Sequence, residues 1–387
     1  MAGLHRPYCR ILSDGGEAGM TKRVLIIGGY GNFGGYIARS LADEANIKLL
    51  IAGRSLDKAG KFAARLTARN APEAVFLDIH GDIVSALAEA RPDIVVHTTG
   101  PFQSQSYTVV EACIKQGCHY IDLADARRYV VGITQYDALA KQKDLLIVSG
   151  ASSVPCLTAA IIDRYRQHFQ SLEKVEYGIS AAQQTNRGLA TVSAIFSYVG
   201  KPFTTLIDGT MQAVYGWQDL HAEKYPELGR RLFGNCDIPD LELFPKRYPE
   251  LKTIRFSAGH EVFVLHIALW LLSWLVRFKI VSSLEKLAPF LLKASFLFDG
   301  FGTSRSGFHM FLSGIGKDGL STTKKFYIVA RQGHGPNIPC MPAILLAKGL
   351  ANGGITARGA QPCLDLIDLE IYLAALKDLD ISVIEEK

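Results

Sequence analysis

The chain has 387 residues, 48% of them hydrophobic, which is enough for a large buried core divided between two domains. Its formal net charge is +5 and its Lys and Arg residues are scattered rather than clustered, so we expect no nucleic-acid partner. Its seven cysteines form no C-x-x-C pair and its His and Cys residues lack metal-ligand spacing, so we expect reduced thiols, a cytoplasmic location and no bound metal.

The first regular pattern begins after residue 20. Residues 1–20 lack the apolar stretch of a secretory signal and show no periodicity, so a flexible tail is expected there. Val24–Ile27 is then a continuous aliphatic run, which is typical of a strand buried on both faces of a parallel sheet. We therefore expect the first domain to begin at residue 21.

A glycine-rich turn follows this strand. It consists of Gly29, Tyr30, Gly31, Asn32, Phe33 and Gly34, which together match G-x-G-x-x-G. Apolar residues then continue at helical spacing, and a strand, a tight turn and a helix in this order are the context of a dinucleotide-binding site. Gly29 is expected to form the turn, Gly31 to let a pyrophosphate approach the backbone, and Gly34 to let the helix pack on the strand. The helix N-terminus would bind the phosphates; a purely structural glycine turn is the alternative.

The second strand, Lys48–Ala52, ends without an acidic residue. An NAD-specific site would carry Asp or Glu there for the ribose 2′-hydroxyl, whereas this chain has Arg54 and Ser55. A guanidinium suits a 2′-phosphate that a carboxylate would repel. The sequence therefore predicts NADP(H) in preference to NAD(H), the alternative being that Arg54 is a solvent-facing loop residue.

Strands and helices continue to alternate up to residue 149. Further strands are expected at Ala74–Leu77, Ile94–His97, Tyr120–Leu123 and Leu145–Ser149, with helices at Ile83–Ala90, Tyr107–Gln116 and Ile133–Lys141. Repeated units of this kind predict an α/β fold with a Rossmann doubly wound parallel sheet. Ligands of such sheets bind at the carboxyl ends of the strands, so Asp78 and Thr99 are also predicted to line the cofactor site.

Three side chains around the end of the fifth strand are candidate proton donors. They are Tyr120, Asp122 and Asp125, each at the edge of the sheet where a cofactor would lie. The alternative is that the two carboxylates are helix caps or turn residues. No Tyr-x-x-x-Lys pair appears near the expected site and no Ser/His/Asp order suggests a hydrolase, so we assign no catalytic residue.

Residues 99–125, with the sequence TGPFQSQSYTVVEACIKQGCHYIDLAD, resemble the saccharopine dehydrogenase family of NAD(P)-dependent oxidoreductases. The stretches GGYGNFGG, AGRS and SGASSVP occur in the family order. The resemblance implies a Rossmann domain at 21–155 plus 335–387 and an inserted α+β domain at 156–334 with a mainly antiparallel sheet. It also implies that Gly100, Pro101 and Phe102 line the nicotinamide end, although Phe102 is equally consistent with a core aromatic residue.

Members of this family reduce an imine in lysine metabolism, and related proteins reduce double bonds in lipid precursors. Here Ser152–Cys156 replaces an acidic L-D-P-G element of the lysine-pathway enzymes, so we do not expect saccharopine as the substrate. The resemblance implies an NADP(H)-dependent oxidoreductase that reduces an imine or activated double bond of a small or lipid-like substrate. The alternative is a non-catalytic NADP(H)-binding scaffold or redox sensor, associated with a membrane.

The inserted domain contains an unusually apolar segment, 262–298. Its first half, Val262–Val276, has only His266 and Ser273 as polar residues, and it is shorter than the ~20 residues of a membrane-spanning helix. Three interpretations remain open: a buried or homodimer-interface helix pair, a hydrophobic lid over an apolar substrate, and a hairpin peripheral to a membrane.

The rest of this domain shows weaker patterns. Strands are expected at Val175–Ala181, Lys201–Asp208, Met211–Tyr215 and Lys324–Ala330, a helix at Gly188–Tyr198, and a surface excursion over 216–255. Two helices near the end of the chain, Met341–Leu350 and Leu366–Leu376, have aliphatic faces and are expected to pack on the first domain.

Overall fold

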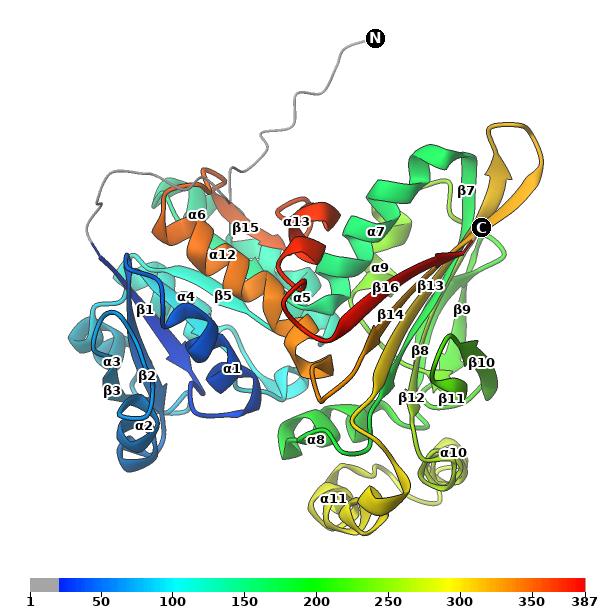
Figure 1. The fold of residues 1–387 in the computed structure, drawn as a ribbon, viewed down its shortest axis with the longest axis horizontal. Helices are drawn as coiled ribbons and strands as arrows, with labels where there is room; N and C mark the ends of the chain where they lie inside the picture. The colour runs from blue at the N-terminus through cyan, green and yellow to red at the C-terminus, as the bar shows by residue number, and fades with distance from the viewer. Residues whose placement is uncertain (1–20, 387) are drawn as a thin grey trace.

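The computed structural model describes residues 21–386, and the tail predicted at 1–20 lies outside the described residues. Two seven-stranded sheets stand next to each other, with helices on their faces and between them (Figure 1). A separate two-stranded hairpin, β8 (Pro202–Ile207) and β9 (Thr210–Tyr215), accompanies the second sheet.

The first sheet is parallel throughout, which confirms the predicted Rossmann architecture. In sheet order its strands are β3 (Glu73–Phe76), β2 (Ile47–Gly53), β1 (Lys22–Ile27), β4 (Ile94–His97), β5 (His119–Asp122), β6 (Leu146–Ser149) and β15 (Gly359–Pro362). The order reverses direction between β1 and β4, and this switch point is where ligands of doubly wound sheets bind.

Helices cover both faces of this sheet. They are α1 (Asn32–Leu41), α2 (Leu56–Ala63), α3 (Ile83–Ala90), α4 (Thr108–Gln116), α5 (Arg127–Gly132), α6 (Asp137–Gln142) and α12 (Met341–Ala351). Because successive strand residues point to opposite faces, Val24 and Ile26 pack with α1, while Leu25 and Ile27 pack with α3 and α4. Both faces are buried, which explains the uninterrupted aliphatic sequence of β1.

The second sheet is mainly antiparallel, as predicted. Its order is β10 (His221–Tyr225), β11 (Gly229–Asn235), β12 (Thr253–His260), β7 (Phe169–Ala181), β13 (Ser306–Gly316), β14 (Ser321–Ala330) and β16 (Ile381–Glu386). Only the central pair β12–β7 is parallel. Strand β16 pairs with β14, so the final segment of the chain contributes β15 to the first sheet and β16 to the second.

The surface excursion predicted over 216–255 is wrong. This stretch contains β10, β11 and α9 (Asp240–Arg247), and its Trp217, Phe233 and Phe244 side chains are fully buried. The charged residues that suggested a surface location are partly satisfied inside the fold. Arg231, for example, pairs with Glu261 at 3.0 Å, and both side chains are buried.

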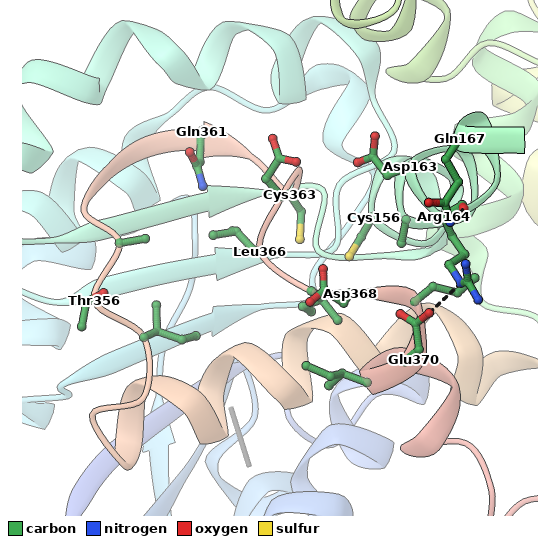
Figure 2. A pocket seen from close by; sticks show the side chains of 17 residues that line it. Cys156, Asp163, Arg164, Gln167, Thr356, Gln361, Cys363, Leu366, Asp368 and Glu370 are labelled. Carbon is green, nitrogen blue, oxygen red and sulfur yellow. Dashed lines mark hydrogen bonds and ion pairs between the residues drawn. The ribbon is translucent and has the colours of Figure 1, made fainter. Parts of the chain in front are cut away.

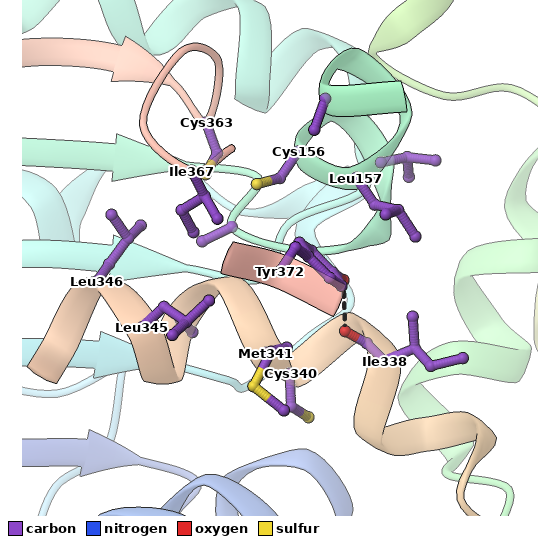
Figure 3. Close-up of a cluster of buried hydrophobic side chains, with 14 of the residues drawn as sticks. Cys156, Leu157, Ile338, Cys340, Met341, Leu345, Leu346, Cys363, Ile367 and Tyr372 are labelled. Atoms are coloured by element: carbon purple, nitrogen blue, oxygen red, sulfur yellow. Dashed lines mark hydrogen bonds between the residues drawn. The ribbon is translucent and has the colours of Figure 1, made fainter. Parts of the chain in front are cut away.

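A continuous hydrophobic core joins the two sheets. It packs α7 (Thr158–Tyr165), α12 and α13 (Leu369–Ala374) together, as Figure 3 shows around Tyr372. The hydroxyl of this buried tyrosine donates a 2.6 Å hydrogen bond to the backbone carbonyl of Ile338. Of the two helices predicted near the end of the chain, α12 packs on α1, β4 and β5 of the first domain, as predicted, whereas α13 packs on α7.

Candidate cofactor-binding site

A cavity of about 460 Å³ lies at the carboxyl edge of the first sheet, beside the switch point. Eight of the predicted cofactor-binding residues line it: Gly31, Asn32, Phe33, Arg54, Asp78, Thr99, Gly100 and Pro101. The loops expected at this edge also supply Gly28, Tyr30, Ile79 and Thr98, whereas sequence reasoning missed His80 and Gln105. The carboxyl-edge rule therefore located this part of the cavity.

The prediction that Gly29 forms the tight turn is wrong, because the residue before it has the turn conformation. Gly28, not Gly29, has the left-handed backbone, with φ of +78°. Gly29 is required for space, because a Cβ there would lie 2.9 Å from the carbonyl oxygen of Ile26. Gly34 serves close packing as predicted: a Cβ would lie 2.3 Å from the carbonyl oxygen of Gly28.

The start of α1 faces the cavity without a side-chain cap. Gly31 is the N-cap, no side chain accepts a hydrogen bond from the first turn, and no acidic residue lies in that turn. Backbone N–H groups and the positive end of the helix dipole are therefore available to an anion. A Cβ on Gly31 would make a tight contact, 3.1 Å, with the carbonyl oxygen of Gly28, and its absence leaves bare backbone where a phosphate would approach.

The end of β2 is covered by Tyr30. Its hydroxyl accepts a 3.2 Å hydrogen bond from the N–H of Ser55, and a Cβ on Gly53 would lie 2.6 Å from its ring. Ser55 caps α2, accepting a hydrogen bond from the N–H of Lys58 at 3.3 Å, and does not line the cavity. Arg54 is exposed at the cavity wall, and among residues 21–386 no carboxylate forms an ion pair with it.

The loop after β4 is braced from within. Nε2 of Gln105 donates to the carbonyl oxygens of Thr99 at 2.6 Å and of Pro101 at 3.2 Å. Phe102 is buried against the rings of His97 and Tyr129, with centroids 4.9 and 5.2 Å away, and does not line the cavity. The loop therefore presents Thr99, Gly100 and Pro101 to a ligand.

The second domain closes one side of the cavity. The first turn of α8 (Leu189–Tyr198) and the preceding Gly188 line it. Asn186 is hydrogen-bonded to Asn32 in α1: its Nδ2 donates to Oδ1 of Asn32 at 2.6 Å, and its carbonyl oxygen accepts from Nδ2 at 3.3 Å. No local sequence signal marks these residues, because only the fold brings them to the glycine turn.

Tyr120, a candidate proton donor, is fully buried beneath the sheet edge. Its hydroxyl lies 3.1 Å from Nδ1 of His97 and 3.1 Å from the hydroxyl of Tyr129. Burial raises the pKa of Tyr120 well above its usual value and lowers the pKa of His97 to about 3. The three groups therefore form a neutral buried network that does not reach the cavity.

Asp122, the second candidate, is also fully buried. Its Oδ1 accepts hydrogen bonds from the N–H groups of Ala124 and Gly150, at 2.9 and 2.8 Å, and from the hydroxyl of Ser149 at 3.0 Å. Burial raises its pKa to about 6, and these hydrogen bonds oppose that rise only in part. The carboxylate joins the end of β5 to the turn after β6.

Asp125, the third candidate, is exposed and lies between the domains. Its Oδ1 accepts a 3.1 Å hydrogen bond from Nε2 of Gln103, which directly follows the cavity-lining loop. Arg127 forms an ion pair with Asp237 from the second domain. Burial raises the pKa of Asp237, and the nearby Asp125 carboxylate adds to that rise. We call Gln103, Asp125, Arg127 and Asp237 the interdomain polar cluster.

Two further groups of the second domain lie next to this cluster. The hydroxyl of Tyr198, at the end of α8, is 2.8 Å from Sγ of Cys236. Burial, followed by the neighbouring Cys236 sulfur, raises the pKa of Tyr198, and burial also raises the pKa of Cys236. Both groups are therefore neutral near pH 7, which leaves the carboxylates and Arg127 as the charges of this region.

A larger cavity, of about 800 Å³, lies between α7 and residues 355–371 (Figure 2). Its acidic side chains are Asp163, Asp365, Asp368 and Glu370. Its one arginine, Arg164, pairs with Glu370 at 2.7 Å. Because this lining would repel phosphates, the smaller cavity suits a dinucleotide better. Within residues 21–386, no group of three or more His, Cys, Asp or Glu side chains is placed to hold a metal ion.

Residues 24–149 match the family model described as the saccharopine dehydrogenase NADP binding domain. The first domain of the chain is therefore similar to the NADP-binding domain of this family. The matched residues include the glycine turn, Arg54 and the 99–125 stretch on which the sequence resemblance was based. This saccharopine dehydrogenase-type domain supports the assignment of the chain as an oxidoreductase.

The whole fold is similar to that of apo saccharopine dehydrogenase (L-Glu forming) from Saccharomyces cerevisiae. The TM-score is 0.65 at 13% identity, over 95% of this chain and 100% of that chain. An amine dehydrogenase from Mycobacterium smegmatis gives a TM-score of 0.48 at 11% identity, over 89% of this chain and 95% of that chain. No curated protein matches the chain in sequence. At such identities the first likeness shows a common fold, including the second sheet.

Proposed function

We propose that the chain is an NADP(H)-dependent oxidoreductase that reduces the C=N bond of a small or lipid-like imine. The observation that carries this proposal is the cavity at the carboxyl edge of a saccharopine dehydrogenase-type domain, with uncapped N–H groups at the start of α1 and bare backbone at Gly31. A dinucleotide fits this cradle, because its pyrophosphate needs both features.

Each wall of the cavity would hold a different part of the cofactor. The start of α1 would hold the pyrophosphate, Arg54 the 2′-phosphate, and Asp78 the adenosine end. The loop Thr99–Pro101 would hold the nicotinamide end. When bound, NADP(H) supplies or accepts the hydride.

The interdomain polar cluster favours an imine over a carbon–carbon double bond. Its two carboxylates, Asp125 and Asp237, outnumber its one guanidinium, that of Arg127, and Asp125 is the carboxylate without an ion pair among the described residues. A carboxylate stabilises the positive charge of a protonated imine. Reduction adds a hydride to carbon and a proton to nitrogen, and Asp125 is the exposed candidate able to donate that proton and then, as a carboxylate, to stabilise the protonated imine. Activated double bonds remain the second substrate class.

The test is NADPH oxidation by the purified chain across a panel of imines and enoyl compounds. Asp125→Asn should lower kcat by at least about 10²-fold and leave the NADPH Kd unchanged. Asp43→Asn, at an exposed position of the first domain, is the matched control and should behave as the wild type. Tight NADPH binding without turnover of any compound would instead identify a cofactor-binding scaffold or sensor.

A further inference from the structure

The outer face of α10 (Phe263–Arg277) is apolar, although the helix already buries its inner face. The buried positions are His266, Leu269, Ser273 and Val276. The exposed apolar positions are Phe263, Val264, Leu271 and Leu275, with Phe278 at the C-cap, and from Val264 onward they are again spaced by three, four or seven residues. A surface helix normally presents polar side chains to water, but here His266 and Ser273 point inward and apolar side chains point outward.

The inner face of α10 is fixed in place. Nε2 of Gln218 donates to the hydroxyl oxygen of Ser273 at 3.4 Å, and the ring of His266 packs on Trp217 with a centroid distance of 5.2 Å. A Cβ on Gly200 would lie 2.3 Å from the carbonyl oxygen of Ser273, so the chain before β8 touches the helix closely. Rotation that buried the outer row would break these contacts.

The apolar surface continues over α11 (Ala288–Ser295) and the turn that follows it. Phe290, Leu297 and Phe301 are exposed there. Of the nineteen large hydrophobic side chains exposed among the described residues, eleven lie between Phe263 and Phe301. We call these eleven the α10–α11 surface, and Figure 1 shows both helices at one end of the second domain. Such a concentration marks a surface that meets an apolar partner.

The charges beside this surface are mostly positive. Segment 263–301, which carries the surface, contains four basic residues and two acidic residues, Glu285 and Asp299, and Asp299 pairs with Arg187. Arg277 stacks on the ring of Tyr215, 4.1 Å from its centroid. Lys279, Lys286 and Lys293 are exposed, and none of them forms an ion pair in the part of the chain that the structure describes.

We propose that the α10–α11 surface docks on the face of an anionic lipid bilayer. Apolar side chains would enter the boundary between headgroups and acyl chains, and the three lysines would contact anionic headgroups. None of the helices within residues 21–386 is long and apolar enough to cross a membrane. The helices would therefore lie in the plane of the interface, as amphipathic membrane-binding helices do.

Charge favours this occupant over a second copy of the chain. A two-fold interface pairs a surface with itself, so a dimer here would bring two sets of unpaired lysines together with few carboxylates to neutralise them. A bilayer that contains acidic lipids supplies the missing negative charge.

The docking surface is connected to the cofactor cavity by one helix. Helix α8 packs against α11, and its first turn lines the cavity. Arg187, just before α8, pairs with Asp299 at 2.6 Å, and Gln183 donates a 2.8 Å hydrogen bond to the carbonyl oxygen of Ser295. The proposal does not depend on the reaction, because it concerns only the outer face.

The test is flotation of the purified chain with lipid vesicles of two compositions. The wild type should float with vesicles of phosphatidylcholine containing one quarter phosphatidylglycerol, and much less with phosphatidylcholine alone. Raising the salt concentration should weaken the binding, because contacts between lysines and headgroups are screened. Equal flotation with both compositions at all salt concentrations would overturn the electrostatic part of the proposal.

Substitutions test whether the chain binds vesicles through the α10–α11 surface. Leu271→Asp with Phe278→Asp should abolish flotation, and Lys286→Gln with Lys293→Gln should weaken it by about tenfold or more. Leu320→Asp, in the β13–β14 turn, is the matched control: Leu320 is 68% exposed, against 56% for Leu271 and 66% for Phe278. The control should float as the wild type does, and all variants should keep the wild-type NADPH Kd.

Two outcomes would overturn the proposal. One is a wild type that ignores anionic vesicles but sediments as a dimer that Leu271→Asp with Phe278→Asp converts to a monomer, which would assign the surface to a second copy. The other is loss of flotation by Leu320→Asp to the same extent as by the surface variants.

Discussion

The two sheets of this protein differ in how far apart in the sequence their neighbouring strands lie. In the first sheet, six of the seven strands come from residues 22–149, in a regular alternation with helices. In the second sheet, β7 lies between β12 and β13, although these three strands begin at residues 169, 253 and 306. A local pattern is therefore enough to build the first sheet, whereas the second depends on long-range contacts.

Glycines show the same contrast in their function. In the first sheet, Gly31 and Gly34 leave space for a ligand and for the helix above it. In the second sheet, a Cβ on Gly314 would lie 2.1 Å from the carbonyl oxygen of Ser171 on the neighbouring strand. The first set serves a site and packing together, and the second serves packing alone.

The largest expected effect on stability comes from replacing Gly34 or Gly314 with alanine. Gly34→Ala and Gly314→Ala should each lower the free energy of unfolding by more than about 3 kcal/mol, because the new Cβ meets backbone atoms that cannot move aside. Urea unfolding measures this loss. Only Gly34→Ala should also abolish NADPH binding, measured by calorimetry on the protein that remains folded.

Gly60→Ala is the control for this pair. Gly60 lies inside α2, where a Cβ would be 3.9 Å from its nearest neighbour, so the substitution should stabilise the chain by about 0.5–1 kcal/mol. If Gly314→Ala is folded but no longer binds NADPH, the glycines of the second sheet also serve cofactor binding, which contradicts the proposed difference between the two sheets.

A buried carboxylate of the second domain gives the next largest effect. Oδ2 of Asp240 accepts hydrogen bonds from the hydroxyls of Thr158 and Tyr177, at 2.6 and 2.8 Å. Burial raises the pKa of Asp240 to about 7, above its usual 3.8. Between these values the folded state keeps a proton that the unfolded state has lost, so stability falls as pH rises from about 4 to about 7.

Asp240→Asn should remove this part of the pH dependence, because an amide does not titrate. The difference in free energy of unfolding between the variant and the wild type should therefore change with pH. It should favour the variant by on the order of 2 kcal/mol more at pH 7 than at pH 4. Thermal unfolding across this pH range measures both. An unchanged slope between pH 4 and pH 7 in the variant would show that Asp240 does not titrate there.

Arg54 tests whether the first sheet alone selects the cofactor. Arg54→Ala should raise the Kd for NADPH by about tenfold or more and leave the Kd for NADH unchanged, because only NADPH carries the 2′-phosphate. Arg65→Ala, at an exposed position just after α2, is the matched control and should alter neither value. If Arg54→Ala raises the Kd for NADPH and the Kd for NADH equally, Arg54 instead supports the structure of the site and does not bind the 2′-phosphate.

The contrast between the sheets also explains how much could be predicted from the sequence. The strands and helices around β1 and β4 follow their sequence patterns closely, since each element buries its own aliphatic run. Strand β15 was missed because Gly-Ala-Gln-Pro has no strand pattern, and it pairs with β6 only because α12 brings the chain back. The region 216–255 was missed because its buried aromatic residues are interspersed with charged ones.

The candidate site divides in the same way. Residues next to a strand end, such as Gly31 and Arg54, were predictable from their position along the chain. Gly188 and Asp237 were not, because they reach the first domain only through the fold of the second. Asp122 and Asp125 are three residues apart, and sequence alone did not distinguish the buried carboxylate from the exposed one.

The smallest expected effect tests the contact between the two regions. Asn186→Ala removes the 2.6 Å hydrogen bond to Asn32 at the start of α1, and it should raise the NADPH Kd about threefold, as expected for one exposed hydrogen bond. Gln184→Ala is the matched control, since its amide donates to the carbonyl oxygens of Asp299 and Gly302, both in the second domain. A weaker NADPH affinity in the first variant alone would show that the second domain helps to hold the cofactor. The same loss in both variants would mean that the whole segment before α8 acts as a unit, and no loss in either would leave cofactor binding to the first sheet alone.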